Sequence, residues 1–449
     1  MSALPEAVDT VFPGVRADLE TLVRIPSVSA NGSDTPPMRE CAERVAALLA
    51  GTGLSTRLLE VPGAPPAVFG ERRGPAGATT VLLYAHYDVQ PAGDIDAWRT
   101  PPFEPVERDG RLYGRGASDD KAGFATHLAA LRVLPVDLPL TVKVIVEGEE
   151  ELGSPHAADL LAAYAEELSA DVIVVADSEH WRVGTPALTV SLRGLVDCVV
   201  EVRTLQNGVH SGQFGGAVPD ALMAMARLIA TLHDDAGQVA VQGLVSAEPP
   251  GVDLPEADLR SSGGVLDGVR LIGSGPIASR LWRQPAISVL AIDAPRLSEA
   301  INQIVPVARA KVSMRLAPGQ DPSTAMDALV AHLQANAPWG ARVTVTRGSS
   351  AEPFAAPADS IAATAFRDGS REAWGVEPVD IGVGGSIPLV AALSHVYPRA
   401  SILLTGVGEP TSAIHGPNES QDLGDLKRSC LAEALALTQL AGATSGRTP

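Results

Sequence analysis

The chain has 449 residues, of which 45% are hydrophobic and 19% are charged, and its formal net charge is −19. This length suggests two or three domains, and the excess of acids disfavours nucleic acid and anionic membranes as partners. No apolar stretch reaches the roughly 20 residues that span a bilayer, and the N-terminus lacks a secretory pattern, so we expect a cytoplasmic protein without a membrane partner.

The first part of the chain alternates between helical and strand patterns. Apolar periodicity predicts helices at residues 38–49 and 122–133, and short apolar runs predict buried parallel strands at 81–85, 142–146 and 172–175. Such alternation is typical of βαβ units in a sheet that helices cover on both faces. We therefore expect an α/β domain with three layers, αβα, and a mostly parallel sheet.

The pattern changes after residue 177 and returns near the C-terminus. The middle part predicts strands at residues 187–202, 308–316 and 343–346, and helices at 219–233 and 323–334. The tail then predicts a strand at 402–404 and a closing helix at 423–440. The sequence therefore predicts one domain made of residues 1–186 and 352–449, with an α+β domain of residues 187–351 inserted into it.

Acids and histidines follow the predicted strands of the first domain. His86 and Asp88 follow the first strand, residues 147–151 the second and Asp177 the third, while His415 follows the last strand after a short loop. Each alone is ordinarily a surface residue. Together they meet at one edge of a parallel sheet, and the three cysteines are too widely separated to form a thiolate site. Nitrogen and oxygen donors of this kind suit zinc, cobalt or manganese in a hydrolytic site.

Seven sequence elements appear in a recognisable order. In chain order they are His86-Tyr-Asp88-Val-Gln-Pro, Gly114-Arg-Gly-Ala-Ser-Asp119-Asp-Lys, Glu147-Gly-Glu-Glu150-Glu151-Leu-Gly-Ser, Asp177, His210-Ser-Gly, Gly384-Gly-Ser386-Ile-Pro and His415-Gly-Pro-Asn-Glu. They resemble the motifs of the dinuclear zinc exopeptidase family of aminoacylase, carnosinase and glutamate carboxypeptidase, over about residues 20–440. The amino-acid sequence of residues 88–91 and 109–116 is similar to that of the carnosinase-like dipeptidases.

This resemblance implies a cofactor of two divalent metal ions, most simply Zn²⁺, with Co²⁺ or Mn²⁺ as alternatives. By position in the motifs, His86 and Asp177 would hold one ion, and Glu151 and His415 the other. Asp119 would bridge the two ions. A water bridging the ions would be the nucleophile for amide hydrolysis.

The resemblance also assigns three catalytic roles. Asp88 would orient His86 by accepting its free N–H, and Glu150 would be the general base that takes the proton from the water. His210 would reach the site of a partner subunit and stabilise the oxyanion, or it is an ordinary surface histidine. The inserted domain would then serve as a lid and as the interface of a homodimer.

Four residues are candidates for substrate binding. Arg315 could clamp a substrate carboxylate, although an exposed charge on a half-buried strand fits the pattern nearly as well. Gly385 and Ser386 would offer N–H groups and a hydroxyl to the same carboxylate, and Asn302 is a further candidate. The other histidines fit no ligand position and are interpreted as structural: His127, His156, His180, His233, His332 and His395.

We therefore predict a metal-dependent hydrolase that cleaves the amide bond of small peptides, as a dipeptidase or a carboxypeptidase-like exopeptidase. One alternative is an N-acyl amino acid deacylase, because the same metal centre would serve it. Another is a non-catalytic protein that binds metal or peptide, although loss of Glu150 or of a ligand would be expected there and none is lost.

Overall fold

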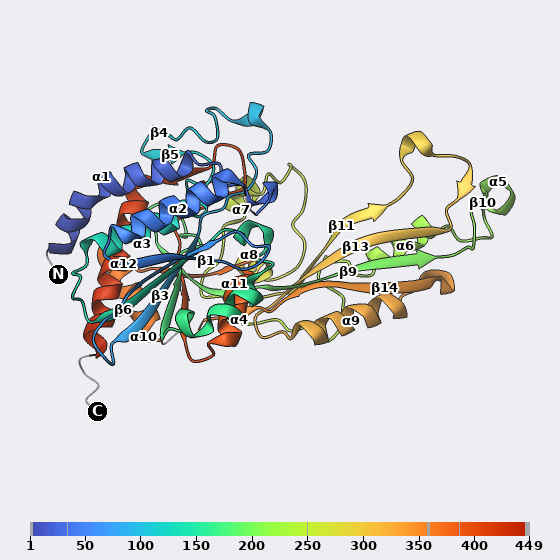
Figure 1. Ribbon diagram of the computed structural model, residues 1–449. Helices are drawn as coiled ribbons and strands as arrows, with labels where there is room; N and C mark the ends of the chain where they lie inside the picture. Colours follow the sequence, from blue (N-terminus) through green and yellow to red (C-terminus); the bar gives the residue numbers. More distant parts are fainter. Residues whose placement is uncertain (1–2, 34, 249, 357–359, 386, 445–449) are drawn as a thin grey trace. The chain divides into compact units, whose positions relative to one another are not determined.

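The computed structural model describes residues 3–33, 35–248, 250–356, 360–385 and 387–444. The chain divides into two compact units (Figure 1). The first is built from Met1–Val190, Ala356–Ile381 and Ile387–Pro449, and the second from Ser191–Ala355 and Gly382–Ser386. Among the helices in the described ranges, none has the length and apolar character needed to cross a membrane.

The first unit contains a large mixed sheet with the strand order β1-β2-β6-β3-β7-β17-β8-β15, and β16 also pairs with β8. Its central strands β6, β3, β7 and β17 are parallel, and the strands on either side of them are antiparallel. The strands are β1 Ser55–Leu59, β2 Ala67–Arg72, β3 Thr79–His86, β6 Leu140–Glu147, β7 Val172–Val175, β8 Ala187–Leu192, β15 Phe354–Ala355, β16 Val379–Val383 and β17 Ser401–Leu404.

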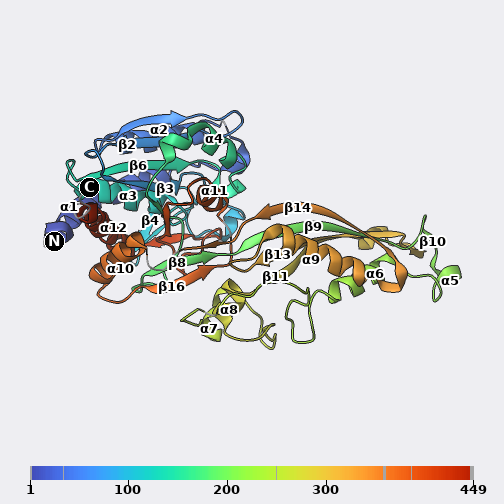
Figure 2. The same ribbon diagram turned by 90° about the horizontal axis from the view of Figure 1, so that it is seen from below.

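Helices cover both faces of this sheet (Figure 2). The connections β3–α3–β6 and β6–α4–β7 step across the sheet in opposite directions, so right-handed crossovers place α3 and α4 on opposite faces. Helices α1 and α12 pack with α3, and α10 packs with α12, whereas α11 packs with α4. The helices are α1 Ala3–Val23, α2 Pro36–Ala50, α3 Lys121–Val133, α4 Ala157–Leu168, α10 Ile361–Trp374, α11 Pro388–Val396 and α12 Leu423–Thr444.

Burial on both faces explains the apolar strand sequences. Residues 81–85 of β3 and 172–175 of β7 are all buried, as expected for parallel strands between two helical layers. The predicted three-layer α/β fold with a mostly parallel sheet is therefore confirmed in the centre of the sheet. A small separate sheet, in the order β18-β5-β4, connects the loop after β17 with the chain before α3. Its strands are β4 Val106–Arg108, β5 Arg111–Tyr113 and β18 Ser420–Asp422.

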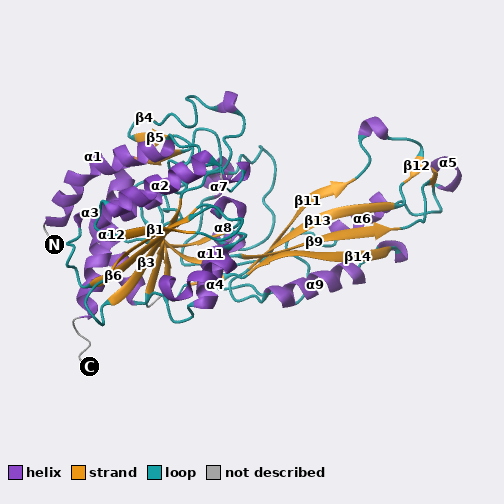
Figure 3. Ribbon diagram, in the orientation of Figure 1, coloured by secondary structure: helices purple, strands orange, loops and turns teal. Residues whose placement is uncertain are grey.

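The second unit is built on an antiparallel sheet with the order β11-β13-β9-β14 (Figure 3). Helices α6 and α9 pack against it and share its apolar core. In strand β13, buried apolar residues alternate with the exposed Arg309 and Lys311, as its sequence predicts, whereas Ser313 is buried and Arg315 is half-buried. The elements are β9 Gly194–Arg203, β10 Val209–His210, α5 Ser211–Phe214, α6 Ala221–Ala230, α7 Glu256–Ser262, α8 Ile277–Trp282, β11 Ala286–Asp293, β12 Gln303–Ile304, β13 Val307–Leu316, α9 Pro322–Ala335 and β14 Arg342–Ala351.

The borders between the units differ slightly from the predicted domain borders. The sequence pattern at residues 187–202 predicts one strand-like region, but the structure divides it into β8 and β9. Strand β8 pairs with β17 in the large sheet, whereas β9 pairs with β13 in the second unit. The chain therefore leaves the first unit after residue 190 rather than after 186, and residues 382–386 join the second unit.

Candidate active site

The carboxyl ends of β6, β3 and β7 bring the predicted residues to one edge of the sheet. His86 is the last residue of β3 and pairs with Glu147, the last residue of β6. Asp177 lies two residues beyond the end of β7, which is parallel to β3. Neighbouring parallel strands end at the same edge, so these side chains meet there.

Glu150 and Glu151 lie in a short 3₁₀ turn directly after β6. A side chain at Gly148 would clash with the ring of Tyr87, so the chain can enter this turn only with glycine there. Gly153 ends the turn in the left-handed region, with φ of 81°. Because the turn replaces a strand, the adjacent carboxylates can both reach the edge of the sheet.

Two groups of potential ligands form at this edge. The first is His86, Glu150 and Asp177, and the second is Asp119, Glu151 and His415; within each group the donor atoms lie within 4.8 Å of one another. In the second group, Nε2 of His415 is 3.0 Å from an oxygen of Asp119 and 3.0 Å from one of Glu151.

Asp119 connects the two groups. Its Oδ1 lies 3.0 Å from Nε2 of His86, and its Oδ2 lies 3.0 Å from Nε2 of His415. One carboxylate thus offers an oxygen to each group, which is the arrangement expected of a bridging ligand. The loop that carries His415 is strained, because this residue has φ of 62° and Ala413 and Asn418 also lie in the left-handed region.

Asp88 contacts both the histidine and the turn that follows β6. Nδ1 of His86 lies 3.2 Å from Oδ1 and 3.1 Å from the carbonyl oxygen of Asp88. Both are acceptors, so Nδ1 carries a proton, and Nε2 is the nitrogen that would bind a metal. The Asp88 carboxylate also accepts the backbone N–H groups of Glu150 and Glu151, each at 3.2 Å. It therefore orients a ligand and the two adjacent glutamates together.

Sequence reasoning missed two residues close to these ligands. Gln90 donates from its side chain to Oε2 of Glu151 at 2.9 Å and from its backbone to Oε1 at 3.1 Å. Asp120 accepts the backbone N–H of His86 at 3.2 Å. Both residues lie within the quoted motifs: Gln90 is two positions after Asp88, and Asp120 directly follows Asp119. Their position in these motifs is the sequence feature that could have identified them.

The electrostatics of the edge favour added positive charge. Burial raises the pKa of Glu150 to about 7, with the charges of Asp119 and Glu151 adding to the effect. Hydrogen bonds to Asp119 and Glu151 raise the pKa of His415 to about 10. The acids of this cluster outnumber its histidines, and protons are retained to offset the excess negative charge. A donor set of nitrogen and oxygen atoms with such an excess fits divalent cations well.

The other predicted residues lie in the second unit. His210 is exposed at the end of β10, and the next residue donates its backbone N–H to the carbonyl of Asn302 at 3.1 Å, so these two candidates are neighbours. Arg315 is half-buried on β13, opposite Leu195 of β9. Gly385 lies in the turn after β16, and Ser386 lies outside the described residues.

Arg193 was not singled out from the sequence, yet it lies close to two of these candidates. Its guanidinium donates to the carbonyl of Gly384 at 3.2 Å. Burial and the positive charge of Arg315 lower the pKa of Arg193 to about 10. Two guanidinium groups therefore lie near the glycine turn, an arrangement that attracts anions.

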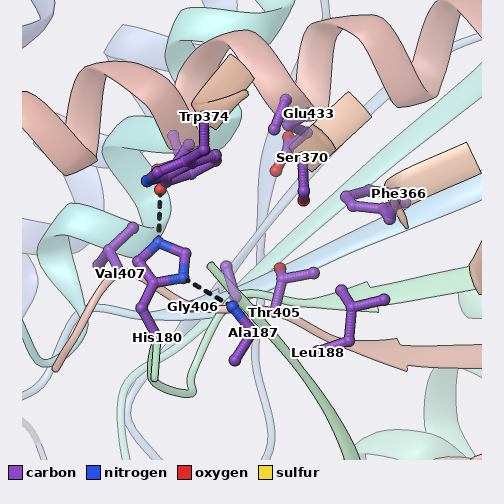
Figure 4. Close-up of a pocket in the computed structure, with 14 residues that line it drawn as sticks. His180, Ala187, Leu188, Phe366, Ser370, Trp374, Thr405, Gly406, Val407 and Glu433 are labelled. Atoms are coloured by element: carbon purple, nitrogen blue, oxygen red, sulfur yellow. Dashed lines mark hydrogen bonds between the residues drawn. The ribbon is translucent and has the colours of Figure 1, made fainter. Parts of the chain in front are cut away.

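Three of the remaining histidines of the first unit, His127, His156 and His180, have protein partners. His127 pairs with Glu433 through Nδ1 at 2.8 Å. His180 lines a small pocket of about 20 Å³ that is formed mainly by β8, α10, α12 and the residues directly after β7 and β17 (Figure 4). Its Nδ1 accepts the N–H of Ala187 at 3.4 Å, and its Nε2 lies 3.0 Å from Oγ of Ser429.

The comparison with known proteins identifies the family. The profile of Peptidase family M20/M25/M40 matches residues 82–439. The chain belongs to this family. A cysteinylglycine-S-conjugate dipeptidase of Corynebacterium striatum is 36% identical to this M20 chain over 402 residues, which cover 88% of each protein. The Cys-Gly metallodipeptidase dug1 of Schizosaccharomyces pombe is 27% identical over 452 residues, which cover 94% of each.

Solved structures agree with this assignment. The crystal structure of human carnosine dipeptidase 1 matches the M20 chain with a TM-score of 0.78 at 25% identity, and 98% of each chain is covered. The predicted resemblance, the fold class and the prediction of a hydrolytic enzyme are therefore confirmed.

Proposed function

We propose that the protein is a metal-dependent dipeptidase that hydrolyses the amide bond of small peptides. The observation that carries this proposal is the pair of ligand groups, His86 with Asp177 and Glu151 with His415, which share Asp119 at the carboxyl edge of the sheet. The relatives described above are dipeptidases, which supports small peptides as the substrate class.

The donor set fits two divalent cations. His86 and Asp177 would hold one, Glu151 and His415 the other, and Asp119 would bind both. We propose zinc as the native metal, because nitrogen and oxygen ligands with an open position are typical of hydrolytic zinc sites, and cobalt or manganese suit the same donors. When bound, such ions polarise a carbonyl group and make hydroxide available at neutral pH.

Glu150 is the proposed general base. Among the described residues, its carboxylate makes no hydrogen bond, so it is free to accept a proton from water and deliver it to the leaving amine. Its pKa of about 7 lies close to the optimum for a group that must accept a proton and then release it. Asp88 positions Glu150 through the backbone N–H, at 3.2 Å, and fixes the orientation of His86.

We propose that the substrate carboxylate binds in the second unit. Arg315 would clamp it, Gly385 and Ser386 would donate hydrogen bonds to it, and Asn302 would contact the bound peptide. The positive charge of Arg193 beside Arg315 supports this assignment, because two guanidinium groups close together favour an anion.

The first unit would thus be the catalytic domain and the second a lid and dimerisation domain. His210 would stabilise the oxyanion in the site of the partner subunit, so that the homodimer is the active form. Its exposed position at the end of β10 supports this role, because an exposed histidine is available to another subunit. We also propose a cytoplasmic location.

A comparison of substrate classes tests the proposal. Unblocked dipeptides and N-acetyl amino acids would be offered to the zinc-loaded protein, and release of free amino acids would be measured. We expect higher kcat/KM on the dipeptides. Turnover of acetylated substrates alone would make the protein a deacylase, and no turnover of either class would support the non-catalytic alternative.

A further inference from the structure

A buried ion pair lies directly behind the candidate metal site. Arg115 and Glu419 are 1% and 0% exposed, and Nη1 of the arginine lies 2.5 Å from Oε2 of the glutamate. The two residues are far apart in sequence, and neither belongs to the candidate ligand groups. Burying two charges requires compensating contacts, so the partners of this pair indicate what it holds in place.

Glu419 accepts hydrogen bonds from the backbone of the loop that ends in Asp119. Its Oε1 accepts the N–H groups of Ser118 at 2.9 Å and of Asp119 at 3.1 Å. Its Oε2 accepts the N–H of Gly116 at 3.1 Å. A single carboxylate therefore fixes the backbone of the residue that lies between the two ligand groups.

Arg115 contacts the other ligand loop. Its Nη2 donates to the carbonyl oxygens of His415 at 3.1 Å and of Gly416 at 3.4 Å. The same nitrogen donates to the carbonyl of Pro91, at 3.3 Å, in the segment that follows β3. Arg115 thus holds the backbone of His415 while its partner glutamate holds the backbone of the opposing ligand.

We infer that Arg115 and Glu419 form a positioning pair that sets the distance between Asp119 and His415 and thereby the affinity of the cation they share. This inference rests on the proposed metal-dependent function. The side chains of these two ligands meet at 3.0 Å, although their loops lie almost 300 residues apart in sequence. The left-handed backbone of His415 is unfavourable by itself and requires such external support.

The pair acts more strongly on one cation than on the other. His86 and Asp177 are carried by β3 and by the chain directly after β7, and both strands are held by the large sheet. His415 lies in a loop, and Arg115 is bonded to its backbone. Loosening the pair would disturb Asp119, which both groups share, but the first group keeps two ligands held by the sheet. The cation of the second group would therefore be weakened more strongly, because His415 also loses the support of its loop.

Glu419→Gln is the most selective variant. It keeps the size of the side chain and one acceptor oxygen, but the NH₂ group that replaces the other oxygen cannot accept hydrogen bonds, so the donors now bound to that oxygen lose their acceptor. Glu433→Gln is a matched control, because it also neutralises a buried glutamate, whose partner His127 lies on α3 and contacts neither ligand loop. Arg115→Lys keeps the charge and loses the forked geometry, so it serves as a second arm if Glu419→Gln does not fold.

The test is a Co²⁺ titration of metal-stripped protein, followed by calorimetry and by the visible absorption of bound cobalt. Urea unfolding of each metal-stripped variant would establish that the protein is folded before titration. For wild type we expect two bound ions. For Glu419→Gln we expect one ion to bind about 10–100-fold more weakly, with the other ion within about threefold of wild type. Glu433→Gln should bind both ions as wild type does.

Unchanged binding of both ions in Glu419→Gln, or equal weakening of both, would overturn the inference, since the pair would then be only a packing feature. Failure of the inference is distinguishable from failure of the proposed function. In the first case wild type binds two ions and cleaves dipeptides while Glu419→Gln shows no selective loss. In the second case wild type itself binds no cobalt, and both proposals fall.

Discussion

Replacing Glu150 with glutamine separates proton transfer from cation binding. Glutamine has the same size and keeps one carbonyl oxygen, but it cannot accept a proton at neutral pH. General base catalysis contributes about 10²–10⁴-fold, so we expect kcat for a dipeptide to fall by that factor, equivalent to about 3–5 kcal/mol of transition-state stabilisation. The backbone contact from Glu150 to Asp88, at 3.2 Å, does not involve the altered atoms, so the turn should persist.

The structure allows one alternative role that this variant also tests. Glu150 lies within 4.8 Å of the donor atoms of His86 and Asp177, so it could be a ligand rather than a base. The assay therefore combines steady-state hydrolysis with the metal content of the purified variant. Glu149→Gln is the matched control, since Glu149 bonds to Nδ1 of His156 at 2.9 Å and belongs to neither ligand group.

Three outcomes can be separated. Loss of activity with both cations retained supports the general base. Activity within about threefold of wild type would refute it, because no proton acceptor would remain at this position. Loss of activity together with loss of one cation would make Glu150 a ligand.

In wild type, kcat/KM should fall as pH is lowered, because the base must be ionised. The pKa of Glu150 is about 7, and bound cations would lower it further, so the decrease in kcat/KM should occur at or below pH 7.

Three further predictions concern orientation, stability and assembly. Asp88→Asn should weaken cation binding about 10–100-fold, because the substituted side chain no longer fixes the orientation of His86. Affinity would be measured by competition with a chelating indicator, and unchanged affinity would contradict the orienting role of Asp88. Burial lowers the pKa of His180 from 6.5 to about 4. Between these pH values the unfolded state binds more protons than the folded state, so the free energy of unfolding decreases as pH falls from about 6.5 to about 4. Urea unfolding of the metal-free protein should show wild type losing about 2 kcal/mol more than His180→Gln between roughly pH 7 and pH 5, and equal losses would contradict the assignment. If His210 serves the partner's site, a mixture of inactive His210→Ala and Glu150→Gln subunits should regain about one quarter of wild-type activity after subunit exchange, whereas no recovery would argue against a shared site.

The sequence predicts most of what lies at the carboxyl edge of the central sheet. Buried parallel strands are apolar throughout, so β3, β6 and β7 are visible as short apolar runs, and the residues after them must meet at one edge. This rule alone is enough to bring His86, Glu151 and Asp177 together. The same rule places His415, which follows the last strand after a short loop, near this edge, and the sequence resemblance adds Asp119 as the bridging ligand.

Other features depend on contacts that a linear pattern does not contain. The sequence pattern does not predict helix α1, because Pro13 interrupts it, yet the apolar side of this helix packs on α3 and α12. The predicted domain border places strand β8 in the inserted domain, because only its pairing with β17 shows that it belongs to the large sheet. Arg115 and Glu419 lie within two of the quoted motifs, but no sequence pattern gives either of them a role, and their pairing follows from tertiary packing alone.

The most direct test of the central claim is dipeptide hydrolysis by metal-stripped protein before and after adding zinc, cobalt or manganese. Bound cations would be counted by elemental analysis in the same samples. We predict negligible turnover without metal and restored turnover once two cations are bound per chain, with little recovery at lower occupancy. Full activity in the metal-free protein, or two bound cations with no hydrolysis of any dipeptide, would contradict the assignment of this edge of the sheet as a dinuclear dipeptidase site.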